Sequence, residues 1–152
     1  MFPKARMVIR EKQTNHINYS DFQMLDKNAV AVAECIKRYS LPIESINLTN
    51  NCLKSKQCIM LIDSLSRHFP KLQNLKLSKN KLGLAGSKHL ASAIKQMKSL
   101  VQLDLSSNEI GDVGVNEIIT ACRDYGMIEY LDISGNNIGK TSYSNEVAEN
   151  LY

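Results

Sequence analysis

Apolar residues recur at a fixed spacing through the last two thirds of the chain. Segments 43–53, 72–82, 100–110 and 128–138 all read LxxLxLxxNxL, with Ile in place of Leu at some positions. The alternation of apolar and polar residues within each segment has the period of a short strand that buries one face. Since the segments start 29, 28 and 28 residues apart, the chain is predicted to be built from four tandem units.

One asparagine closes each segment, at the point where the strand must give way to a turn. Its carboxamide can donate and accept hydrogen bonds, and so can pair with backbone groups that the turn leaves without partners. Stacked once per unit, these side chains are predicted to form a ladder along the molecule. The four residues are Asn51, Asn80, Asn108 and Asn136.

A helical pattern follows each turn. Apolar residues at i, i+1, i+4 and i+7 share one face of a helix, which can pack against the buried face of the strand. Each unit is therefore predicted to be strand, turn and helix, although the apolar positions of the fourth come one residue later. The predicted helix-face residues are Leu61, Ile62, Leu65 and His68 or Phe69, then Leu90, Ala91, Ile94 and Met97, then Ile118, Ile119, Cys122 and Tyr125, and last Val147, Ala148 and Leu151.

This unit resembles the repeat of the leucine-rich repeat proteins, and its length is similar to that of the ribonuclease-inhibitor-like subtype. The resemblance implies an α/β solenoid, a right-handed arc with a parallel β-sheet on the concave face and helices on the convex face. The first unit departs from the pattern, because Lys54 and Gln57 stand where later units have glycine. The four repeats are expected at 43–71, 72–99, 100–127 and 128–152.

The two ends of the repeat array need cover, because terminal repeats expose the side of the core. Residues 25–42 carry apolar side chains at helical spacing and are expected to form an N-terminal capping helix. Residues 1–24 are polar and rich in Lys and Arg, and are expected to form a basic arm. No strand follows the fourth repeat, so we expect further repeats or a partner to cover that edge of the sheet.

Composition narrows the class of protein. A chain of 152 residues with 43% hydrophobic residues can bury one core. It has no apolar stretch long enough for a membrane span, and its start lacks the pattern of a secretory signal. The four cysteines form no CxxC pair and the three histidines are isolated, so no metal or cofactor is expected. We expect a cytoplasmic protein, with a cytoskeletal, ciliary or nuclear location left open.

Polar residues that flank the buried strand leucines are expected to face a partner on the concave face. Asp104 and Asp132 should lie side by side, and an acid/base pair is one interpretation of them. We favour a non-catalytic surface, because the tight turns and filled core leave no deep pocket and no nucleophile converges on the pair. Tyr130 is the expected aromatic anchor. The candidate residues are Asn47, Thr49, Asn74, Lys76, Ser78, Gln102, Asp104, Ser106, Tyr130, Asp132 and Ser134.

Charge is polarised along the chain. Residues 1–100 hold 17 basic and 6 acidic residues, whereas 101–152 hold 2 and 9, and 71–98 hold seven lysines without an acid. An acidic protein surface is therefore the expected partner of the second repeat. Nucleic acid is the weaker alternative, because 71–98 offer no aromatic residue for base stacking.

The resemblance raises one further alternative, because leucine-rich repeat proteins include activators of the small GTPase Ran that use an arginine on a loop. Here Arg38 and Arg67 fall in predicted helices, so neither matches such a loop. The sequence thus favours a non-catalytic protein-interaction module or scaffold over a regulator of a small GTPase.

Overall fold

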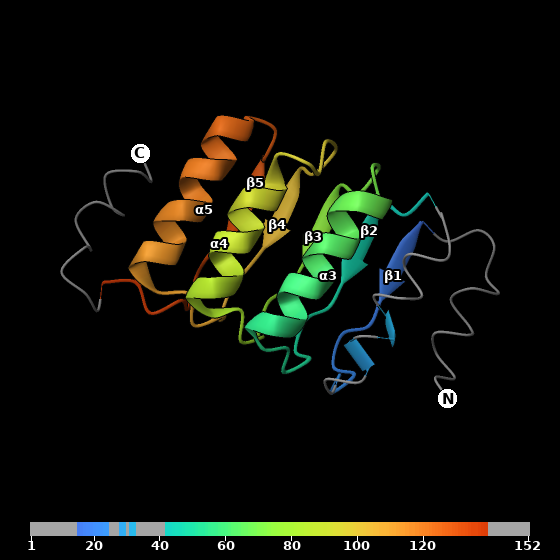
Figure 1. The fold of residues 1–152 in the computed structure, drawn as a ribbon, viewed down its shortest axis with the longest axis horizontal. Coiled ribbons are helices and arrows are strands. Elements are labelled where there is room, and N and C mark those ends of the chain that lie inside the picture. Colours follow the sequence, from blue (N-terminus) through green and yellow to red (C-terminus); the bar gives the residue numbers. More distant parts are fainter. Residues whose placement is uncertain (1–14, 25–27, 30, 33–41, 140–152) are drawn as a thin grey trace.

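A computed structural model describes residues 15–24, 28, 29, 31, 32 and 42–139. It shows a parallel five-stranded sheet in the order β1-β2-β3-β4-β5. Three helices alternate with the later strands and lie side by side over one face of the sheet (Figure 1). The elements are β1 (His16–Asn18), β2 (Ser45–Asn47), α3 (Ser55–His68), β3 (Asn74–Lys76), α4 (Gly83–Ile94), β4 (Gln102–Asp104), α5 (Gly111–Tyr125) and β5 (Tyr130–Asp132).

The predicted unit of strand, turn and helix is confirmed in the described repeats. Ile46, Leu75 and Leu103 lie in register at the centres of neighbouring strands and are buried under the helices. The expected apolar faces of α3, α4 and α5 pack against them. In the first repeat Phe69 takes the last of these positions and His68 stays partly exposed.

The asparagine ladder is present, and all four members are buried. The Asn108 amide Nδ2 donates to the carbonyl oxygens of Leu77, in the preceding repeat, and of Leu105 in its own. The Asn136 Oδ1 in turn accepts from the backbone N–H of Asn108 and of Ile110. Each carboxamide thus pairs backbone groups that a turn leaves buried, where an unpaired group would be costly.

Residues 16–18 form a strand where the sequence predicted only part of a basic arm. β1 pairs with β2, and the backbone N–H groups of Phe22 and Met24 donate to the Asn51 Oδ1. The unit escaped detection because Tyr19 and Met24 replace two of its leucines and Phe22 stands at the asparagine position. The predicted boundary between a basic arm at 1–24 and a capping helix at 25–42 otherwise stays a prediction.

Two predicted helices fall mainly outside the described residues. The fourth repeat's helix, with Val147, Ala148 and Leu151, lies beyond them altogether. Of the expected capping helix, Asn28, Ala29, Ala31 and Val32 are described; their backbone is helical, and Ala29 and Val32 are buried. None of the helices in the described part of the chain is long and apolar enough to cross a membrane.

Candidate protein-interaction surface

The face of the sheet that points away from the helices, here the concave face, carries the candidate residues in rows. The strands are in register, so equivalent side chains of neighbouring strands lie about 4.8 Å apart. The first row is His16, Ser45, Asn74, Gln102 and Tyr130, and the second is Asn18, Asn47, Lys76, Asp104 and Asp132.

The second row has a role inside the fold. The Asp104 Oδ1 accepts from the backbone N–H of Ser106 at 3.0 Å and from its Oγ at 2.8 Å. The Asp132 Oδ1 accepts from the backbone N–H of Ser134 at 2.9 Å, and Asn18 and Asn47 bind the residue two positions later in the same way. Each side chain therefore stabilises the turn after its own strand.

This turn explains the neighbouring carboxylates without an acid/base role. Asp104 and Asp132 are partners in register, as predicted, but each engages its own turn. Lys76 is the exception in the row, because an ammonium group cannot accept a hydrogen bond. It makes no ion pair with any residue that the structure describes.

The row of hydroxyl residues after the strands is less accessible than expected. Ser78 is only 6% exposed, and its Oγ lies 3.0 Å from the Oγ1 of Thr49. Thr49 and Ser106 are partly buried, and only Ser134 is fully exposed. Ser78 is therefore a packing residue and not a partner contact, because its hydroxyl pairs with its neighbour on the adjacent strand.

A shallow depression of about 330 Å³ lies on the concave face over β3, β4 and β5. Tyr130 stands at one side of it with 53% of its surface exposed. Five candidates line the depression and the remaining six do not. The lining residues are Asn74, Leu75, Lys76, Gln102, Leu103, Asp104 and Tyr130.

Comparison with known proteins shows which fold this architecture resembles. The family model described as leucine rich repeat matches residues 96–118 and 127–142. The structure is similar to the solved C-terminal domain of tropomodulin from Caenorhabditis elegans, with a TM-score of 0.72, covering 96% of this chain and 87% of that one. The protein has a leucine-rich-repeat fold. Sequence identity to that domain is 15%, and no curated protein matches the chain.

The lysines of the second leucine-rich repeat do not form one patch. All seven are exposed, but they surround the repeat. Lys76 lies on the concave face, Lys79 and Lys81 follow β3, Lys88 lies on α4 and Lys95 at its C-cap, and Lys71 and Lys98 follow helices. The run of basic residues in the sequence therefore corresponds to several separate surfaces.

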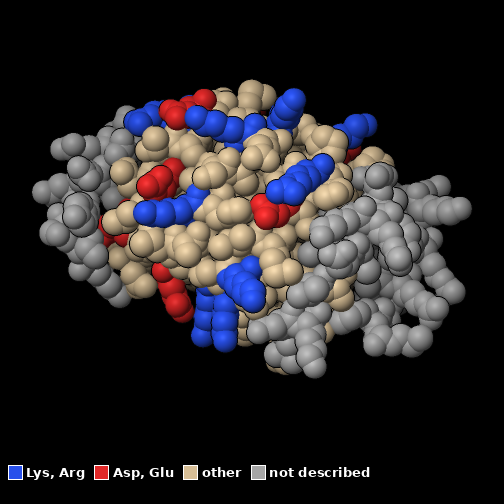
Figure 2. Space-filling model, viewed as in Figure 1, with Lys and Arg blue, Asp and Glu red and all other residues tan. Residues whose placement is uncertain are grey.

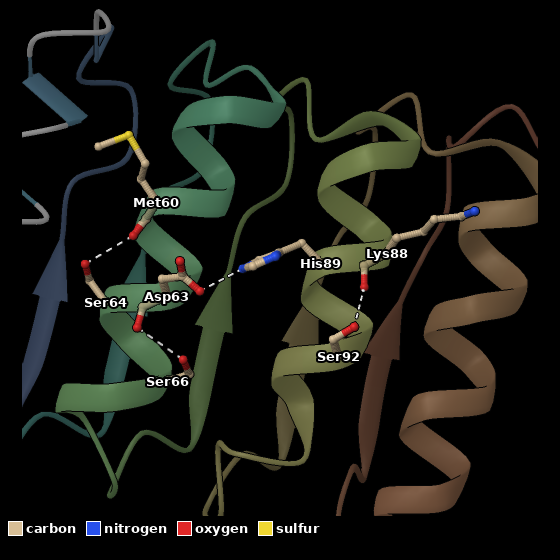
Figure 3. A network of polar contacts seen from close by, with 7 residues as sticks. All are labelled: Met60, Asp63, Ser64, Ser66, Lys88, His89 and Ser92. Atoms are coloured by element: carbon tan, nitrogen blue, oxygen red, sulfur yellow. Dashed lines mark hydrogen bonds and ion pairs between the residues drawn. The ribbon is translucent and has the colours of Figure 1, made fainter.

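The helix face of the leucine-rich-repeat fold mixes both signs of charge (Figure 2). Lys95 Nζ lies 3.2 Å from Asp124 Oδ2 and joins α4 to α5. His89 Nε2 lies 2.8 Å from Asp63 Oδ1 and joins α4 to α3 (Figure 3). Arg67 lies in α3 and not in a loop, and Arg38 lies outside the described residues.

The buried cysteines are poor nucleophiles. Burial raises the pKa of Cys58 to about 12 and that of Cys122 to about 11. Both thiols therefore stay protonated near neutral pH, and the thiolate is the nucleophilic form. No group of three or more His, Cys, Asp or Glu residues within the described part of the chain is arranged to hold a metal ion.

Proposed function

We propose that this chain is a non-catalytic protein-interaction module whose concave-face depression binds a protein partner. Side chains on rigid strands are held in a fixed arrangement toward a partner, and this property supports a scaffold or assembly role. The observation that carries the proposal is that the depression gathers three exposed side chains with no evident role in the fold, those of Lys76, Gln102 and Tyr130.

Scaffold requirements account for most of the concave face. Asn47, Asp104 and Asp132 bind their own turns, and Ser78 packs against its neighbour. Lys76, Gln102 and Tyr130 perform none of these tasks and are exposed. An exposed aromatic residue on β5 and, on β3, a cation without an ion pair among the described residues line one depression, an arrangement that a partner, and not the fold, explains.

Tyr130 is the proposed anchor of the interface. An exposed tyrosine gives large contact area with little conformational entropy to lose, and its hydroxyl can still bond to the partner. The Lys76 ammonium, on the other side of the depression, would pair with a carboxylate of the partner. The preferred partner segment therefore carries an apolar group and an acid.

The test compares Tyr130→Ala with Met127→Ala. Met127 is 54% exposed and lies in the loop between α5 and β5, so the two truncations remove similarly exposed groups. Proteins retained by the wild-type chain from a cell lysate are quantified by mass spectrometry against both variants. We expect Tyr130→Ala to lose the specific partner about tenfold or more, with an unchanged unfolding temperature, and Met127→Ala to keep it.

If the two variants retain the partner equally, the interface does not lie at the depression. The similarity to the tropomodulin domain supports a cytoskeletal assembly as the setting in which to search for the partner. For regulation of a small GTPase, no specific contact argues in favour. Measuring GTP hydrolysis by Ran with and without the chain tests that alternative, and acceleration would establish it.

A further inference from the structure

A second surface lies along the lateral edge of the solenoid at which the strands lead into the helices. Four exposed lysines gather there: Lys54 and Lys56 at the start of α3, and Lys79 and Lys81 between β3 and α4. Figure 2 shows basic side chains projecting from the lower edge of the molecule, where α4 begins. We call these four residues the basic rim.

The first two rim lysines place positive charge at the N-terminus of α3, where it is unfavourable. Lys54 is the N-cap of α3 and Lys56 is its second residue, and no acid lies in the first turn. The N-terminus of a helix carries partial positive charge and favours Asp, Ser or Thr as its cap. Lysines at these positions weaken the helix and are not explained by folding.

Lys79 occupies a backbone position that suits other residues. Its φ is 53°, in the left-handed region where Gly, Asn and Asp are favoured. The equivalent positions of the other repeats hold Asp21, Asn50, Ser107 and Gly135, all with positive φ. Only the second repeat places a long cationic side chain there.

Lys54 and Lys81 form a pair of like charges. They are partners in an isolated parallel bridge, and the Lys81 backbone N–H donates to the carbonyl oxygen of Leu53 at 2.7 Å. Like charges directly opposite one another on neighbouring strands repel. A neutral or acidic residue at either position would avoid this cost.

No carboxylate of the described residues relieves the charge. The rim lysines make no ion pair, and α4, like α3, has no acid in its first turn. Among the described residues, the corresponding turns of other repeats hold the acids Asp21, which accepts from the Asn50 Nδ2 at 2.7 Å, and Glu109. Three local rules of folding are thus broken by lysines on one edge, the pattern expected where function outweighs stability.

We propose that the basic rim is a second docking surface, which binds an acidic segment of a partner protein. Lysines attract carboxylates as point charges, and two helix N-termini add to the positive potential. Nucleic acid fits less well, because neither connecting loop, 48–54 nor 77–82, contains an arginine or an aromatic residue. This surface is distinct from the concave-face depression and does not depend on it.

The test uses a fluorescent peptide of eight glutamates as the probe, with affinity measured by fluorescence anisotropy at low and at physiological salt. The rim variant is Lys56→Gln, Lys79→Gln and Lys81→Gln. The matched control is Lys71→Gln, Lys88→Gln and Lys98→Gln, three exposed lysines elsewhere in the same region. Both triple variants change the net charge by the same amount, so they separate a local surface from overall charge.

We expect the rim variant to lose about tenfold in affinity at low salt, which corresponds to three exposed charge contacts, and the control to lose less than about twofold. Equal losses in the two variants would overturn the proposal, because overall charge would then explain binding. A thymidine oligonucleotide with eight phosphates is run in parallel. If it binds more tightly than the peptide and loses affinity only in the rim variant, the partner is a nucleic acid and the assignment to protein is wrong.

Discussion

The starts of α3 and α5 follow equivalent turns but carry opposite charges, and their N-cap backbones differ, since that of Lys54 is extended and that of Ile110 is helical. Both helices follow a turn secured by a ladder asparagine, and in neither does a side chain cap the first turn. At α5, Asp112 is 1% exposed in the first turn, and its Oδ1 accepts from the Gly139 backbone N–H at 2.7 Å. At α3 the corresponding region holds Lys54 and Lys56. The charge at the start of α5 therefore serves the fold, whereas the exposed lysines at the start of α3 are available to a partner.

A second difference between the two helices concerns how closely they approach the preceding unit. Gly114 in α5 packs where a Cβ atom would overlap the Oγ of Ser87 and the Cγ2 of Ile110. The equivalent position of α3 holds Gln57, which is buried and whose Oε1 has no hydrogen-bond partner among the residues that the structure describes. The first helix thus has room for a long side chain at the site where the third has none.

The largest expected effect comes from Gly114→Ala. Alanine stabilises an open helix by about 1 kcal/mol relative to glycine, but here the added methyl group must push α5 away from α4. We expect the free energy of unfolding to fall by about 2 kcal/mol, measured by urea denaturation.

The matched change is Gln57→Ala, which also leaves alanine at this position of the repeat. We expect it to change the free energy of unfolding by less than about 1 kcal/mol, because the lost packing is offset by removal of an unpaired buried acceptor. Equal losses in the two variants would show that the helix spacing does not differ as the structure indicates.

Most of the scaffold could be predicted from the sequence because its physical requirements repeat. The segment from 100 to 110 reports its buried strand, its ladder residue Asn108 and its outward Asp104 by alternation alone. β1 could not be found in this way, since Phe22 cannot do what an asparagine does and the pattern is lost. The Asn51 Oδ1 still accepts from the backbone N–H groups of Phe22 and Met24, as the Asn80 Oδ1 does from those of Asn51 and Leu53, so this unit receives the ladder bonds although it has no ladder asparagine of its own.

Candidate surfaces were predictable in position but not in accessibility. Alternation placed Lys76 and Tyr130 on the concave face, yet it placed Ser78 there equally, and only the contact with Thr49 shows that Ser78 is buried. The basic rim was hidden for a different reason. It depends on the bridge between Lys54 and Lys81 and on the positive φ of Lys79, and neither the pairing nor the backbone angle is visible as a motif.

Replacing the N-cap lysine of α3 by a capping residue should stabilise the fold. Lys54 already has the extended backbone of an N-cap, with φ −81° and ψ 168°. Lys54→Ser therefore adds a capping hydroxyl without rearrangement, and we expect a gain of about 1 kcal/mol in the free energy of unfolding by urea denaturation. The control Lys88→Ser, on the exposed face of α4, should gain nothing. If Lys54→Ser is neutral or destabilising, the lysine has a structural role and the contrast with α5 fails.

The smallest expected effect is a difference in how deeply the cysteines of α3 and α5 are buried. Burial raises the pKa of Cys58 in α3 to about 12 and that of Cys122 in α5 to about 11, from an ordinary value of 9.0. A raised pKa stabilises the fold fully below pH 9, and this contribution is lost as the pH rises toward 11 and 12. The lower pKa of Cys122 gives it more thiolate at pH 9, so short exposure of the folded chain to iodoacetamide at pH 9 should label Cys122 faster than Cys58. Peptide mass spectrometry measures both rates, with the exposed Cys52 as the fast internal reference. Faster labelling of Cys58 would mean that α3 opens more readily than α5. The lysines at the start of α3 would then lower the local stability of that helix.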